Sequence, residues 1–154
     1  MFTAGILLGI GLGGFVDGIV FHQILQTHSM LSARVPRTSV ANLEINMFWD
    51  GIFHAAVWVL TAVGIALLWR AGAHRVVRWS GSGFVGALFV GWGLFNLVEG
   101  LIDHHVLHLH HVVEGNGVSL FDYAFLGSAI VFIVGGWLAV RSASQDQTDT
   151  NARS

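Results

Sequence analysis

The sequence has 154 residues, of which 54% are hydrophobic and only 10% are charged, and its mean hydropathy is +0.68. A soluble domain carries roughly 25% charged residues, so this composition excludes a soluble globular protein and indicates an integral membrane protein. A formal net charge of −2 offers no basic surface for nucleic acid, and the absence of Cys excludes disulfides, thiolate metal sites and iron–sulfur clusters.

Apolar segments follow one another along the chain, and each is near the roughly 20 residues needed to cross a bilayer. Backbone groups in lipid must satisfy their own hydrogen bonds, so we predict helices there. The predicted bounds are residues 4–26, 46–69, 83–105 and 118–140. The sequence thus predicts an all-α, four-helix transmembrane domain over residues 1–141. The polar tail, residues 142–154, has no apolar residue other than Ala and is predicted to be disordered.

The distribution of Arg residues predicts how the chain crosses the membrane. Residues 70–82 hold Arg70, Arg75 and Arg78, Arg141 closes the last helix, and residues 106–117 hold no Arg. By the positive-inside rule, both termini and the 70–82 loop lie in the cytoplasm, with the loops 27–45 and 106–117 outside. Arg34 and Arg37 in the first outer loop oppose this orientation.

An internal repeat relates residues 11–28 to residues 93–110, with seven identities in 18 aligned positions. In this alignment Asp17 meets Glu99, His22 meets His104, and His28 meets His110. A weaker similarity between residues 49–53 and 121–125 pairs Asp50 with Asp122. The repeat predicts two helical hairpins related by duplication, with a pseudo-axis along the membrane normal.

All four segments carry acidic or His residues in their outer half, and none does so in the inner half. A charged group in the bilayer costs several kcal/mol unless it is paired, hydrated or neutralised, and no Arg or Lys lies nearby in sequence. Protons, water or mutual contacts are alternatives, but a divalent cation offsets carboxylates and also binds neutral imidazole. The predicted ligands are His22, Asp50, His54, Glu99, His104 and His108, with Asp17, Asp103 and Asp122 as supporting or alternate ligands.

Helical spacing supports parts of this set and limits others. Asp50 and His54 share a face by i, i+4 spacing, and His104, His108 and His111 form a stripe if their helix continues. His22 lies about 140° round an α-helix from Asp17, so one helix cannot direct all its polar groups to one point. We therefore expect either two related sites, or one site in which acids orient the ligating His residues. His105, His110 and His111 are equally well explained as rim residues without a role.

Carboxylate and imidazole ligands without thiolates suit iron, copper, zinc or manganese. Helix bundles that present Glu, Asp and His inward hold paired metals in other proteins. A haem b between two of His22, His54, His104 and His108 is the less favoured alternative. The sequence leaves open an enzyme, a metal-delivery or accessory subunit, and a structural part of a complex, as it does homo-oligomerisation.

Three stretches, "GFVDGIVFHQILQTHSM", "NMFWDGIFHA" and "VEGLIDHHVLHLHH", resemble the bacterial family known as domain of unknown function 2243. The resemblance covers about residues 3 to 140 and implies a small four-helix protein of the bacterial inner membrane. It also implies an association with respiratory oxidases and their assembly, but no activity. The metal is indicated by the residues alone; with this resemblance added, we expect metal-dependent redox chemistry linked to the respiratory membrane, with oxidase components or a quinone as candidate partners.

Overall fold

The computed structural model describes residues 1–73, 80–115 and 117–153, and all of its regular elements within these ranges are helical. In chain order they are α1 (Phe2–Val16), the π-helix η1 (Asp17–Ile24), α2 (Val40–Ala73), α3 (Gly81–Glu99), the π-helix η2 (Gly100–Val106) and α4 (Leu120–Arg153). Because η1 continues α1 and η2 continues α3, the described residues form four rods, each long and apolar enough to cross a membrane. The predicted four-helix membrane architecture is confirmed.

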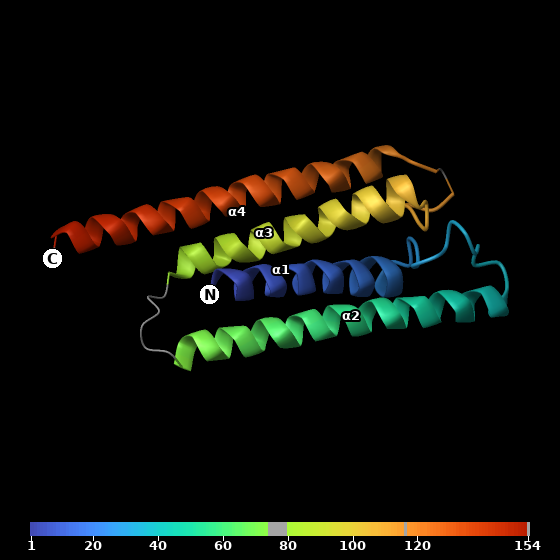
Figure 1. Ribbon diagram of the computed structural model, residues 1–154. Coiled ribbons are helices and arrows are strands. Elements are labelled where there is room, and N and C mark those ends of the chain that lie inside the picture. Colours follow the sequence, from blue (N-terminus) through green and yellow to red (C-terminus); the bar gives the residue numbers. More distant parts are fainter. Residues whose placement is uncertain (74–79, 116, 154) are drawn as a thin grey trace.

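The helices lie in the order α2, α1, α3, α4, so α1 and α3 form the centre (Figure 1). α2 packs on α1 and α4 packs on α3, and in the described ranges α2 and α4 do not touch. Within the most apolar windows, 44% of the residues on the two central rods are buried, compared with 11% on α2 and on α4. The outer helices therefore present apolar surface that suits lipid.

Glycine lets the two central helices approach closely at a pair of positions. A Cβ atom on Gly9 would overlap the carbonyl oxygen of Leu88, and a Cβ atom on Gly91 would overlap that of Ile6. Small residues allow membrane helices to come into backbone contact in this way. Both contacts are equivalent under the 82-residue offset of the repeat, so the axis that relates the two halves runs between α1 and α3.

Two boundaries differ most from those predicted. α2 begins at Val40 rather than residue 46, and α4 continues as helix to Arg153, where the composition predicts a disordered tail from residue 142. Residues 142–153 contain neither Gly nor Pro, so no residue there ends the helix, although they contribute little apolar surface. Arg75 and Arg78, which contribute to the predicted orientation, lie outside the described residues.

Both central helices change from α to π geometry at equivalent points. The i→i+5 bonds that close them join Leu25 N to Val20 O at 2.8 Å and Leu107 N to Ile102 O at 2.7 Å. One residue later, Gln26 (φ 52°) and His108 (φ 46°) take the left-handed conformation, which turns the chain sharply. We call this end of the bundle, where residues 25–39 and 107–119 connect the helices, the histidine end.

Candidate metal centre

The π-helices decide where the acidic and His side chains point. In an α-helix, Asp17 and His22 would lie on different faces, but the wider i→i+5 turn brings residues five apart toward the same side. His22 Nε2 accordingly lies 2.9 Å from Asp17 Oδ2. The prediction that one helix cannot aim both groups at one point is wrong here, because it assumed α geometry throughout. Glu99, at the end of α3, and His104, in η2, are also five residues apart.

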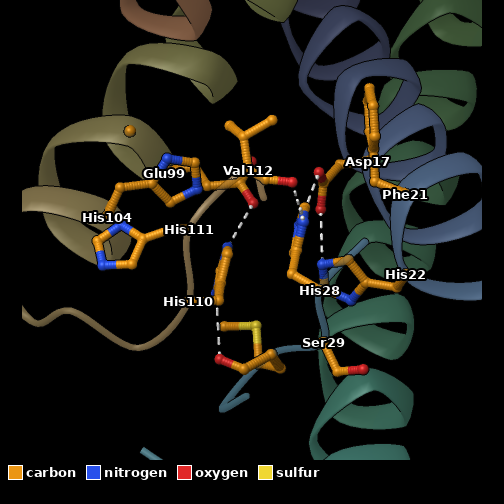
Figure 2. A network of polar contacts seen from close by, with 12 residues as sticks. Asp17, Phe21, His22, His28, Ser29, Glu99, His104, His110, His111 and Val112 are labelled. Atoms are coloured by element: carbon orange, nitrogen blue, oxygen red, sulfur yellow. Dashed lines mark hydrogen bonds and ion pairs between the residues drawn. The ribbon is translucent and has the colours of Figure 1, made fainter. Parts of the chain in front are cut away.

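The sharp turns after the π-helices return two further histidines to the bundle axis. His28 and His110 stack face to face, with ring centroids 4.7 Å apart and planes inclined by 2°. Each ring also approaches the acid of its own half: His28 Nε2 is 3.5 Å from Asp17 Oδ1, and His110 Nε2 is 3.4 Å from Glu99 Oε1. Figure 2 shows this stacked pair between the side chains of the two halves.

A buried cluster of six side chains results, and we call it the central cluster. It consists of Asp17, His22, His28, Glu99, His104 and His110, each at most 4% exposed. Three groups within it have ligand atoms that all lie within 4.8 Å of one another: His22–His28–His110, Glu99–His104–His110 and Asp17–His22–Glu99. Two atoms bound to one ion at about 2.0–2.2 Å can be at most about 4.4 Å apart, so small adjustments suffice for coordination.

Each imidazole in the central cluster has an acceptor beside its Nδ1 atom. His28 Nδ1 lies 3.1 Å from the carbonyl oxygen of Val112, and His110 Nδ1 lies 3.1 Å from that of Met30. Met30 and Val112 are equivalent in the repeat, so each histidine contacts the carbonyl group of the opposite half. A carbonyl oxygen can only accept, so these Nδ1 atoms carry the hydrogen. The second nitrogen of each ring, Nε2, is then left with a free lone pair that points into the cluster.

Two acids lie beside the Nδ1 atoms of the remaining imidazoles, His22 and His104. Asp50 Oδ1 lies 2.9 Å from His22 Nδ1 and also accepts from Met30 N at 2.8 Å. Asp122 Oδ1 lies 3.1 Å from His104 Nδ1, though not in hydrogen-bond alignment, and accepts from Val112 N at 3.0 Å. Carboxylates placed behind a ligating imidazole in this way fix its orientation and raise its basicity.

The inward-facing atoms of the central cluster have no hydrogen-bond partner. These buried atoms are the Nε2 atoms of His22, His28, His104 and His110, together with Asp17 Oδ2 and Glu99 Oε2. In the described residues the ion-pair partners of these two carboxylates are all imidazoles. Burial, with repulsion from His28 and His104, also holds the pKa of His110 well below its usual 6.5, so this ring is neutral at neutral pH.

The structure brings together some of the predicted site residues and separates others. His22, Glu99, His104 and Asp17 lie in the central cluster, and Asp50 and Asp122 support it from behind. His54, His108 and Asp103 lie outside the six-residue cluster. His54 directs Nδ1 to the carbonyl oxygen of Asp50 on its own helix at 2.7 Å, and its Nε2 side packs over Gly18.

Sequence reasoning missed two members, His28 and His110. Both follow the predicted helices; His110 is interpreted there as a rim residue, and His28 is not among the predicted ligands. The available signal was the repeat itself, because the pattern acid-x4-His-x5-His occurs once in each half, at Asp17 and at Glu99. The left-handed turns at Gln26 and His108 direct these rings inward, and residue patterns do not predict such turns.

A family model described as "Predicted membrane protein (DUF2243)" matches residues 4–143 of this chain. No curated protein matches the sequence. No solved structure matches it either.

Proposed function

Since the chain belongs to the DUF2243 family of predicted membrane proteins, a description that specifies no chemistry, we propose its function from the central cluster. The protein binds transition-metal ions there and uses them for redox chemistry within the membrane. The observation that carries this proposal is the set of four buried Nε2 atoms and two carboxylate oxygens that converge without hydrogen-bond partners.

A cation accounts for these atoms better than mutual hydrogen bonds do. His22 Nε2 and Asp17 Oδ2 are 2.9 Å apart, yet their alignment does not make a hydrogen bond. Two lone-pair atoms at this separation repel each other unless a positive charge lies between them, and burial away from water makes the repulsion costly. A proton would satisfy one such pair, whereas metal ions would satisfy all six side chains.

The duplicated ligand set favours a pair of ions. Each half supplies one carboxylate and two imidazoles: Asp17, His22 and His28 from the first half, and Glu99, His104 and His110 from the second. Two His residues with one carboxylate, leaving open positions, form the ligand set of many non-haem iron oxygenases. Iron is therefore the first candidate, and Glu99, which is grouped with His104 and His110 and also with Asp17 and His22, could contribute to both ions.

Burial favours a resident metal over one that is passed on. A delivery protein needs an exposed, exchangeable site, but every side chain of the central cluster is at most 4% exposed. The geometry also disfavours haem, because neighbouring imidazole rings pack with centroids 4.6–4.8 Å apart and leave no slot for a porphyrin. The link to the respiratory membrane follows from the family resemblance and remains a prediction.

Metal content tests the proposal. Protein purified from bacterial membranes in mild detergent, with its metals quantified by mass spectrometry, is expected to hold about two ions per chain. His28→Ala and His110→Ala each remove one central ligand and are expected to lower this content, most strongly when both are combined.

His105→Gln is the matched control. His105 lies on η2 beside His104, but its Nδ1 contacts the carbonyl oxygen of Gly100 and its ring packs near Tyr123. It is expected to keep the wild-type metal content. Folded wild-type protein with only trace metal, or folded double-alanine protein with unchanged metal, would contradict the proposal. A Soret band in the wild-type spectrum would instead favour haem.

A further inference from the structure

Two surface pockets lie beside the central cluster, and two of the residues that line each one correspond under the repeat. One, of about 410 Å³, is lined by His22 and Asp50 together with Gln26, Ser29 and Arg37. The other, of about 490 Å³, is lined by His108, His111 and Glu114 together with Ser32 and Arg34. Under the 82-residue offset, His108 corresponds to Gln26 and His111 corresponds to Ser29. The two pockets therefore share these two repeat-related positions, and there they offer different chemistry.

The first pocket is unsuited to a metal cation. Arg37 directs its guanidinium toward Gln26 O at 3.0 Å and Ser29 Oγ at 3.5 Å, which places positive charge in the opening. The carboxylate of Asp50 is already engaged by His22 and by Met30 N. An amide and a hydroxyl, with a positive charge beside them, do not attract a divalent cation.

The second pocket carries the ligands that the first one lacks. The rings of His108 and His111 are 5.7 Å apart between centroids, and Glu114 adds a carboxylate whose Oε1 lies 2.6 Å from Ser32 Oγ. Arg34 also lines this pocket, and its guanidinium bonds the carbonyl oxygen of Leu107 at 2.6 Å. Each pocket thus holds one guanidinium, and the two differ in the imidazoles and the carboxylate that the second adds. Imidazole and carboxylate together suit first-row divalent metals.

A graded path of imidazoles leads from this pocket to the central cluster. His108 is exposed, His111 is 6% exposed, and His104 is 1% exposed. The centroid of His111 lies 6.3 Å from that of His104, and Asp122 Oδ1 lies between them, 3.5 Å from His111 Nδ1 and 3.1 Å from His104 Nδ1. The buried Nδ1 atom of His111 has no hydrogen-bond partner.

We propose that His108, His111 and Glu114 form a capture site for divalent transition-metal ions, and that the central cluster is loaded from it through His111 and His104. Only the second half of the repeat has this path, so an otherwise duplicated centre fills from one side. The inference rests on the proposed metal-binding function and adds how the metal reaches the buried site.

Loading kinetics test the capture site, with Co²⁺ as an optical probe. Chelator-stripped protein in detergent is mixed rapidly with dilute Co²⁺, the absorbance of bound cobalt is followed, and final cobalt is quantified. His108→Gln converts this position to its repeat counterpart, and Gln26 shows that Gln tolerates the left-handed backbone. We expect loading to slow by about tenfold or more, with an unchanged final content of the cobalt that stays bound after gel filtration, and His111→Ser to act likewise.

The converse variant, Gln26→His with Ser29→His, is expected to speed loading by opening the second side. His105→Gln, which lies off the path, is the control and should load at the wild-type rate. Wild-type rates in both His108→Gln and His111→Ser, with normal final cobalt, would overturn the capture site and leave the central cluster intact. Wild-type protein that binds no Co²⁺ would overturn the central cluster and the capture site with it.

Discussion

At the scale of single residues, the direction of each imidazole decides what the site can bind. The Nδ1 atoms of His28 and His110 face carbonyl oxygens, and those of His22 and His104 face the carboxylates of Asp50 and Asp122. All four Nε2 atoms lie inside the central cluster without a hydrogen-bond partner. The acids behind the rings are as much a part of this arrangement as the rings themselves.

Asp50→Asn tests this supporting role. The amide oxygen can still accept from Met30 N, but the negative charge behind His22 is lost, so the imidazole becomes a weaker and less fixed ligand. We expect metal affinity, measured by Zn²⁺ titration, to fall about 10- to 100-fold. Glu44→Gln is the control because it removes an exposed carboxylate from the same helix. Equal losses in both variants would mean that net charge, and not orientation, is responsible.

Residue patterns pointed to part of the central cluster but not to all of its members. Asp17, His22, Glu99 and His104 could be chosen because an acid and a His at matching positions of two apolar helices are costly in lipid unless a partner compensates them. His54 was favoured for its i, i+4 relation to Asp50, yet it packs over Gly18, at the place where Leu126 packs over Gly100 in the other half. Sequence spacing gives the face of a helix but not the neighbour that covers it.

At the scale of elements, the two π-helices build the site. They rotate His22 and His104 toward the acids of their own helices, and the left-handed residues that follow return His28 and His110 to the axis. The number and approximate positions of the membrane helices could be predicted, because long apolar runs have one solution in lipid. The π geometry could not, since α- and π-helices share the same apolar composition and differ only in local hydrogen bonding.

Gly9→Ala tests the close approach of the central helices. Its methyl group would meet the carbonyl oxygen of Leu88 on α3 and force the helices apart, so we expect a loss of about 1–3 kcal/mol in the free energy of unfolding. Thermal unfolding in detergent, followed by circular dichroism, measures it. Gly127→Ala on α4 is the control, because its methyl group meets nothing within 4 Å and should be neutral or stabilising. A Gly9→Ala protein as stable as the control would rule out backbone contact there.

At the scale of the whole molecule, duplication explains both the symmetry and its breaks. Two copies of a hairpin, each with an acid and two histidines, meet between α1 and α3 to form one enclosed centre at the histidine end. α2 and α4 lie outside this pair, and each supplies one supporting acid, Asp50 or Asp122. The halves differ at the surface, where only the second has His108 and His111.

The predicted orientation places the histidine end on the periplasmic side, and the absence of native Cys makes it easy to test. Thr38→Cys introduces a thiol at the exposed histidine end, and Ser142→Cys introduces one at the opposite end of α4. A membrane-impermeant maleimide added to intact spheroplasts should label only the first, and inverted vesicles should show the reverse. Labelling of Ser142→Cys alone in spheroplasts would place the histidine end in the cytoplasm.

The most direct test of the central cluster is anomalous X-ray diffraction from crystals of protein purified from its own membranes. Data collected on either side of the absorption edge of the co-purified metal should give strong peaks among His22, His28, His104 and His110, within bonding distance of their Nε2 atoms and of Asp17 or Glu99. A map with no anomalous peak within reach of these atoms would contradict the metal centre.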